Sequence, residues 1–222
     1  VYDRTLKCLN PEEQGIGFEQ IIVDGLLCDN MEAIYHWMIE SLKQVQARFG
    51  NIRVISITTH GATMAFIGNT KDTQFKGDGG LVFPIVSYEH DEGEQLAERF
   101  YRFLGKTPEE LQVQTGTARF SWFMNSARLI YFLKERFPER FERVTLILPF
   151  PQYLGYLLTG KIAAEPTYMG CHNYLLDISG KKYSYEAWHT IIEESLATYT
   201  EYLYVKRRFI PIFIADMENM PL

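Results

Sequence analysis

The chain has 222 residues, of which 46% are hydrophobic, 14% aromatic and 23% charged. This composition is typical of a folded globular protein and excludes a disordered chain. The net charge of -6 is spread over interspersed acidic and basic residues. Because no basic stripe is present, a nucleic-acid partner is not expected.

The cysteines and the apolar runs exclude further classes of protein. Cys8, Cys28 and Cys171 are odd in number and widely spaced, and they lack a CxxC pair, so neither a disulfide framework nor a zinc site is indicated. No apolar run approaches the roughly 20 residues that span a bilayer, and the first residues contain no signal-peptide core. We therefore expect a cytoplasmic protein with no membrane partner and no metal ligands identifiable in the sequence. The chain begins at Val1 rather than Met, and we expect it to be a piece of a longer protein.

In the first half of the chain, apolar spacing predicts a helix followed by two short strands. The helix covers residues 31–49, with Asp29 and Glu32 as its capping box and Gly50 at its end. The β-branched segment 53–58 predicts a buried strand that ends at a polar turn, and a second strand is predicted over 81–86. Polar residues follow both strands. Ligands usually bind at such strand ends in open α/β sheets.

In the second half, helices are predicted over 96–104, from Pro108 onward, over 125–137 and over 151–158. Strands are predicted over 144–148 and 174–177. The alternation favours a single α/β domain, which we assign to residues 1–194. From Ser195 the sequence becomes Tyr-rich and then basic, so we treat 195–222 as a tail to which no place in the fold is assigned.

The polar strand ends supply the candidate binding residues. His60 precedes Gly61, which permits a tight turn or the close approach of a ligand, and the alternative is a turn histidine bonded to the backbone. His90 lies in the polar run 88–92, for which a solvated loop is the alternative. Phe123 belongs to an aromatic run that forms either a binding platform or part of the core.

Other catalytic patterns lack support. The sequence contains no GxSxG, GxxxxGK[ST] or GxGxxG motif, so serine hydrolase, P-loop and Rossmann interpretations lose their usual basis. Cys171 and His172 are adjacent, and adjacent side chains of an extended segment point to opposite faces, which favours packing over a catalytic pair. Glu165 and Asp177 are too far apart in sequence to be judged a carboxylate pair.

Over about Phe18 to Asp177, the chain resembles the amino-terminal domain of FGGY carbohydrate kinases, which include glycerol, xylulose, fuculose and rhamnulose kinases. The similar motifs, in order, are Ile55-Ser56-Ile57-Thr58-Thr59-His60-Gly61-Ala62, Pro84-Ile85-Val86-Ser87-Tyr88-Glu89-His90, Thr115-Gly116-Thr117 with the segment 128–139, and Leu148-Pro149-Phe150-Pro151-Gln152-Tyr153-Leu154-Gly155-Tyr156-Leu157-Leu158-Thr159-Gly160 followed by Glu165-Pro166-Thr167. Each motif is weak by itself. Their common order over most of the chain carries the resemblance.

The resemblance implies a ribonuclease H-like, actin-type ATPase domain, in which helices flank a central mixed sheet. It also implies transfer of the γ-phosphoryl group of ATP to a sugar hydroxyl, with Mg²⁺ shielding the phosphates and an Asp accepting the hydroxyl proton. The expected partners are a small-molecule sugar and ATP, and a homodimer is left open as the assembly. The substrate-binding residues it implies are Thr59, His60, Tyr88, Glu89, His90 and Phe123.

The chain also departs from the family pattern. Nothing before Phe18 matches the family's Asp-x-Gly-x-Thr hairpin, His90 replaces an Asp, and the glycine-rich adenosine site is absent. The catalytic residue is not identified, and Asp216, which follows the apolar segment 210–215 without a preceding glycine, is a candidate. We expect the chain to be the sugar-binding part of a sugar kinase and to be inactive by itself. The alternative is a non-catalytic sugar-binding or interaction module derived from the same fold.

Overall fold

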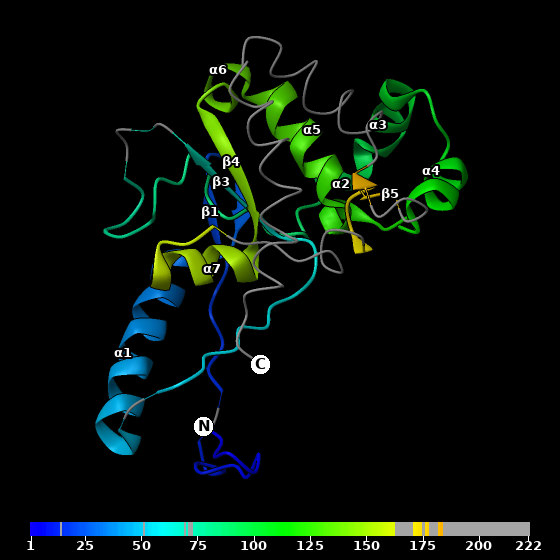
Figure 1. Ribbon diagram of the computed structural model, residues 1–222. Coiled ribbons are helices and arrows are strands. Elements are labelled where there is room, and N and C mark those ends of the chain that lie inside the picture. The colour runs from blue at the N-terminus through cyan, green and yellow to red at the C-terminus, as the bar shows by residue number, and fades with distance from the viewer. Residues whose placement is uncertain are drawn as a thin grey trace.

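The computed structural model describes residues 1–13, 15–50, 52–68, 70, 73–162 and 171–174, together with the backbone of 176–177 and 182–183. Glu165, Asp216 and the tail 195–222 lie outside the described residues, as does the side chain of Asp177. Helices and short strands are mixed along the chain (Figure 1). The elements are β1 (Ile21–Val23), β2 (Leu26–Cys28), α1 (Met31–Phe49), β3 (Met64–Gly68), α2 (Glu92–Gln95), α3 (Ala97–Leu104), α4 (Pro108–Thr115), the 3₁₀ turn η1 (Trp122–Met124), α5 (Ser126–Arg136), α6 (Pro138–Phe141), β4 (Val144–Pro149), α7 (Phe150–Thr159), β5 (Leu176–Asp177) and β6 (Lys182–Tyr183).

The described strands form antiparallel pairs, β1 with β2, β3 with β4, and β5 with β6. The segment 80–87 links the first two pairs. At one end, the Val82 N–H donates to the Phe66 carbonyl at 2.8 Å, and at the other the Ser87 N–H donates to the Leu27 carbonyl at 2.9 Å. The strand expected over 81–86 is therefore present only as isolated bridges to β3 and β2.

Apolar side chains cover both faces of the β3–β4 pair. Met64 and Phe66 of β3 belong to one buried cluster, whereas Ala65 and Ile67 belong to the other, because successive side chains of a strand point to opposite faces. Helix α5 packs into the first cluster, and α7 with the beginning of α1 packs into the second. Burial on both faces explains why β3 and β4 are almost continuously apolar.

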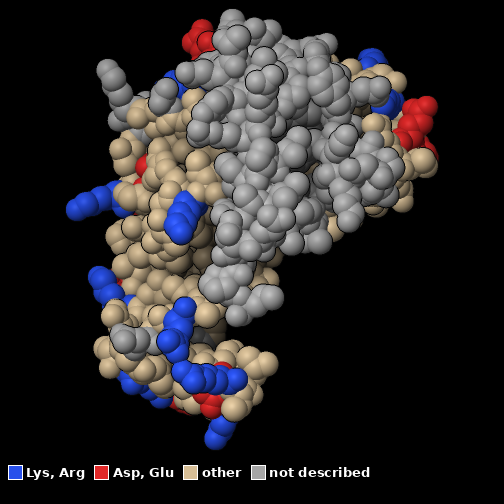
Figure 2. Space-filling model, in the orientation of Figure 1, with Lys and Arg blue, Asp and Glu red and all other residues tan. Residues whose placement is uncertain are grey.

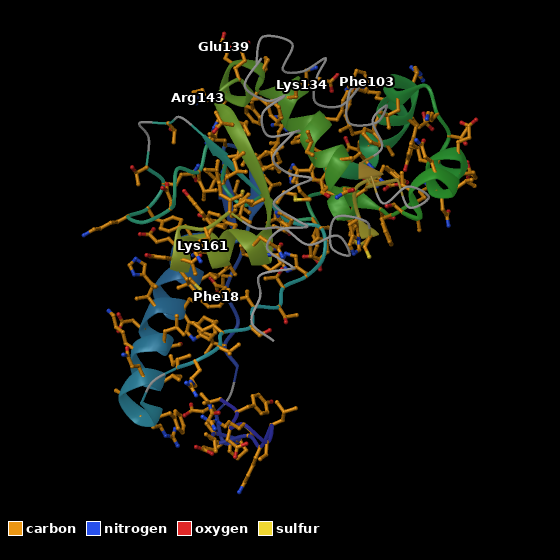
Figure 3. All side chains as sticks on the ribbon, in the orientation of Figure 1. Phe18, Phe103, Lys134, Glu139, Arg143 and Lys161 are labelled. Carbon is orange, nitrogen blue, oxygen red and sulfur yellow. The ribbon has the colours of Figure 1, made fainter. Side chains whose placement is uncertain are left out.

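Helix α1 has the predicted bounds, but its cap and its burial differ from the expectation. The Asn30 side chain accepts a hydrogen bond from the Ala33 N–H at 3.1 Å, so Asn30 caps the helix and the predicted box of Asp29 and Glu32 is wrong. Only Met31 is buried, and the later turns extend away from the strand pairs (Figure 1). Phe18 lies beside this helix (Figure 3), where its ring contacts Trp37 with centroids 5.7 Å apart.

The strand predicted over 53–58 is not formed. Val54 is 83% exposed and Ile55 49% exposed, and the segment has no strand partner among the described residues. An extended segment without a partner leaves its backbone groups to water and its apolar side chains unburied. The buried strand of this region is β3, which follows the His60-Gly61 turn instead of preceding it.

The other helix predictions are confirmed within a few residues. The Thr107 hydroxyl accepts from the Glu110 N–H at 3.2 Å, and the Glu110 carboxylate accepts from the Thr107 N–H at 2.8 Å, which completes the capping box of α4. Asn125 caps α5, and Gly160 ends α7 with a left-handed φ of 69°. The predicted strand 144–148 corresponds to β4.

The described part of the surface carries charges of both signs. On the face shown in Figure 2, many Lys and Arg side chains lie toward the end of the molecule that holds α1 and the N-terminal segment, with Asp and Glu among them. None of the helices within the described residues combines the length and apolar character that a membrane crossing demands.

Arg128 of α5 is a fully buried cation that ties α5 to two loops. Its guanidinium donates to the Gly93 carbonyl at 3.0 Å and to the Phe120 carbonyl, and it lies 3.5 Å from the Glu94 carboxylate. A buried charge is tolerated only where hydrogen bonds replace its hydration. Arg128 therefore stabilises the fold through the positions of these carbonyls.

Replacing Arg128 with Met should lower the free energy of unfolding by about 2–4 kcal/mol, because one buried and one partly buried carbonyl would lose their donor. Urea unfolding followed by circular dichroism measures the change. The matched control is Arg99→Met, which removes an exposed ion pair with Glu135 and should cost about 1 kcal/mol or less. Equal losses for the two variants would contradict the role assigned to Arg128.

Candidate functional site

Polar and aromatic side chains from separate segments meet at His60. The His60 ring lies 5.0 Å from the Tyr88 ring and 5.7 Å from the Phe150 ring, and its Nε2 is 2.6 Å from the Thr63 hydroxyl. The Asp29 carboxylate completes the group at 3.6 Å from the same nitrogen. We call Asp29, His60, Thr63, Tyr88 and Phe150 the His60 cluster.

The secondary structure positions each member of the His60 cluster. Asp29 lies between β2 and α1, and its N–H donates to the Ile85 carbonyl at 2.8 Å. Tyr88 follows the segment 80–87 directly, so the pairing that holds Asp29 also places Tyr88 beside it. Phe150 begins α7, and its N–H donates to the Thr63 carbonyl at 3.0 Å.

Burial governs the electrostatics of the His60 cluster. Burial raises the pKa of the Asp29 carboxyl, and the neighbouring His60 opposes this increase. Burial also raises the pKa of the Tyr88 phenol, with further contributions from the charges of Glu89 and Asp29. The His60 side chain is 39% exposed and the Asp29 side chain only 13% exposed, so His60 is the more accessible of the two.

Four of the sequence-predicted binding residues lie in or next to the His60 cluster. His60 and Tyr88 are in contact, and Thr59 adjoins them, its hydroxyl donating to the His60 carbonyl at 3.0 Å. Glu89 follows Tyr88 and is exposed. Sequence reasoning missed Asp29 as a site residue because its position before a helix indicated a cap.

The two remaining predicted residues, His90 and Phe123, lie in the interior. Their exposed fractions are 5% and 0%, and their rings stack with centroids 5.9 Å apart. The Leu27 N–H donates to His90 Nδ1 at 3.3 Å, so His90 helps to fix the β1–β2 turn region. The structure does not bring these two side chains to the exposed side of the His60 cluster.

A cavity of about 540 Å³ borders Asp29. It includes Asp29 but none of the six predicted binding residues. Its walls come from β1, the first turn of α1, the segments 73–75 and 81–85, and the arginines of α6 and the turn after it. Arg140 is engaged there by the Asp24 carboxylate at 2.7 Å and the Val82 carbonyl at 2.7 Å.

Position 61 requires glycine because the His172 ring approaches its backbone closely. A Cβ atom at position 61 would lie 2.6 Å from His172 Nε2 and 2.8 Å from Cδ2. The His172 ring also contacts the Phe120 ring, with centroids 5.0 Å apart, and its carbonyl accepts from the Ser126 N–H at 2.8 Å. His172 thus packs against the turn that carries His60, as the packing interpretation of this residue predicted.

Gly61→Ala should destabilise the chain by about 1–3 kcal/mol, because the added methyl group overlaps the His172 ring. Combining it with His172→Ala should remove most of this cost. A double-mutant cycle in urea unfolding measures the coupling. Additive losses would show that His172 does not determine the requirement for glycine at this turn.

The pH dependence of stability should report the burial of His90. Its pKa is lowered chiefly by burial, so below about pH 6.5 the unfolded chain takes up a proton that the folded chain resists. The free energy of unfolding should therefore fall between about pH 7 and about pH 5, and less steeply in His90→Asn, whose amide oxygen can replace Nδ1 as an acceptor. His172, whose pKa burial also lowers, should keep part of the slope in both proteins. Equal slopes would contradict this assignment.

Among the side chains that the structure describes, no three from His, Cys, Asp and Glu come together as a set of metal ligands. The His60 cluster contributes one carboxylate and one imidazole, a combination suited to hydrogen bonding with hydroxyl groups.

Comparison with known proteins places this chain in a family. The model of the FGGY family of carbohydrate kinases, N-terminal domain, matches residues 7–196. The L-fuculokinase of Escherichia coli (strain K12) is 26% identical over 157 residues, which cover 70% of this chain and 30% of the relative. The chain thus spans less than a third of the length of that curated relative.

Solved structures agree with this result at the level of the fold. A carbohydrate kinase from Novosphingobium aromaticivorans superposes with a TM-score of 0.63 at 23% identity, covering 77% of this chain and 33% of that chain. Plasmodium falciparum glycerol kinase with ADP gives a TM-score of 0.66 at 20% identity, covering 88% of this chain and 38% of that chain. The family match extends over most of the residues, and the chain therefore belongs to the FGGY family of carbohydrate kinases, as its N-terminal domain.

Proposed function

We propose that this chain is the sugar-binding part of an ATP-dependent kinase that transfers the γ-phosphoryl group to a sugar hydroxyl. The observation that carries the proposal is the His60 cluster, because it brings together two of the polar segments in which the resemblance locates the sugar contacts, 59–60 and 88–89. Family membership supports the reaction class. The proposed substrates are small polyhydroxylated sugars, with ketoses first.

The chemistry of the His60 cluster suits such a ligand. An imidazole, a phenol and the neighbouring Glu89 carboxylate offer both donors and acceptors to hydroxyl groups. The aromatic ring of Tyr88 adds an apolar surface for the C–H face of a sugar. Since the rings of Tyr88 and Phe150 both contact the His60 ring, they restrict its position before a ligand arrives.

The complete reaction involves groups beyond the described residues. When bound, ATP supplies the phosphoryl group and Mg²⁺ shields its charge, so that transfer depends mainly on positioning. Asp216 remains the proposed proton acceptor. We further propose that the strand pairs belong to the central mixed sheet of an actin-type domain formed by residues 1–194, and that the enzyme acts in the cytoplasm.

Sugar binding by the chain tests the proposal directly. In a panel of ketoses, at least one should shift the NMR signals of His60 and Tyr88. His60→Ala should weaken its binding by roughly 10- to 100-fold, because a positioned hydrogen-bonding group is lost. His36→Ala is the matched control, since His36 is an exposed histidine of α1 whose nearest charge is Glu32. Equal weakening by both variants would contradict a site at His60.

Phosphoryl transfer separates the kinase from a binding module. The assay follows sugar-dependent ADP release by the longest product that the gene encodes. Turnover of about 1–100 per second is expected for a kinase of this type. Sugar binding without turnover would favour the non-catalytic module, and the absence of both would favour an interaction scaffold.

A further inference from the structure

Gln20 lies opposite Asp29 at the open end of the β1–β2 hairpin. The antiparallel register pairs Ile21 with Cys28, so the next position outward pairs Gln20 with Asp29. Side chains directly opposite each other in an antiparallel pair project from the same face and are close enough to interact. The Gln20 side chain is accordingly a hydrogen-bond partner of the Asp29 carboxyl.

Gln20 also reaches the neighbouring segment 80–87 at its last residue. Its Nε2 donates to the Ser87 hydroxyl at 2.8 Å. The position of Ser87 is fixed by its own N–H, which donates to the Leu27 carbonyl at 2.9 Å, and its hydroxyl also accepts from the Glu89 N–H at 3.2 Å. The residue before β1 is thereby linked to the turn that carries Tyr88.

The chemistry of a side-chain amide suits this double contact. An amide nitrogen has two N–H donors, whereas an ionised carboxylate only accepts. Nε2 can therefore donate one hydrogen to the Ser87 hydroxyl and the other to the Asp29 carboxylate. The bond from Gln20 stabilises the ionised form of Asp29 and lowers its pKa, in opposition to burial.

The ionised state of Asp29 matters because of its neighbour His60. The Asp29 Oδ2 lies 3.6 Å from His60 Nε2, and the Asp29 side chain is only 13% exposed. Burial favours the protonated acid and the charge of Glu89 acts in the same direction, while His60 and Gln20 favour the carboxylate. A carboxylate orients a neighbouring imidazole only while it is ionised and held in place.

We propose that Gln20 is a positioning residue that holds the Asp29 carboxylate beside His60 by anchoring it to Ser87. The consequence for a ligand rests on the sugar site proposed above, because Gln20 acts on the sugar only through Asp29 and His60. Gln20 lies outside every motif that carries the family resemblance. The β1–β2 register and the pairing of Ser87 place it in this network.

The titration of Asp29 is measured on the full 222-residue chain by ¹³C NMR of labelled carboxyl groups, with Asp29→Asn assigning the signal. Gln20→Met keeps the length of the side chain but removes both donors, so the pKa of Asp29 should rise. Gln20→Lys supplies a donor with a positive charge, so the pKa of Asp29 should stay at or below its wild-type value. Gln44→Met is the control, because Gln44 is an exposed glutamine farther along α1, and it should leave the titration unchanged.

Two outcomes of this measurement overturn the positioning role. One is an unchanged pKa of Asp29 in a folded Gln20→Met variant. The other is an equal rise in Gln20→Met and Gln20→Lys, because a contact that serves packing alone would be disturbed by both. Far-ultraviolet circular dichroism establishes that each variant is folded. If Gln20→Met does not fold, Ser87→Ala provides the second test, since loss of the anchor should also raise the pKa of Asp29 and an unchanged value would contradict the role.

Sugar affinity tests the consequence for the ligand. For a ketose that binds the wild type, Gln20→Met should weaken binding by roughly 3- to 30-fold, whereas Gln44→Met should leave it unchanged. Equal affinity in Gln20→Met, despite a raised pKa of Asp29, overturns this consequence. If the wild type binds no sugar, the proposed function fails, while the titration of Asp29 still decides whether Gln20 acts as inferred.

Discussion

The backbone pairing of the segment 80–87 is the constraint on which the rest of the structure depends. This segment bonds to β3 at its beginning and to β2 at its end. Without it, the hairpin that leads to Asp29 and the strand pair that leads from Thr63 to Phe150 would share no backbone hydrogen bonds with each other among the described residues. The same segment ends at Tyr88, so one pairing event fixes the fold and assembles the His60 cluster.

The His60 cluster combines burial with polarity at some expense of stability. Asp29 is a carboxylate with little access to water, and the His60 ring beside it contacts two aromatic rings. Such arrangements are unfavourable in a protein that needs only to fold, and they are therefore informative about function. Arg128 offers a contrast, because its guanidinium donates to two backbone carbonyls and its role is explained by stability.

The aromatic residues divide between the core and the site in a way that composition does not reveal. Phe66, Phe83 and Phe141 form a set of ring contacts within the first buried cluster. Phe123 stacks on His90 in the same cluster, which supports the core interpretation of its aromatic run. Tyr88 contacts His60 instead, and Phe150 contacts His60 while it also belongs to the second buried cluster.

The sequence by itself determined the helices, β4 and the family resemblance, because helical spacing, capping residues and ordered motifs are local properties of the chain. It did not determine whether 53–58 forms a strand, because a strand exists only when a partner satisfies its backbone groups. Tertiary structure also decided that Asp29 faces His60 while His90 is buried, and that Gly61 accommodates His172. These relations join residues far apart in sequence, and their energies depend on distance, burial and orientation, which only the packed chain specifies.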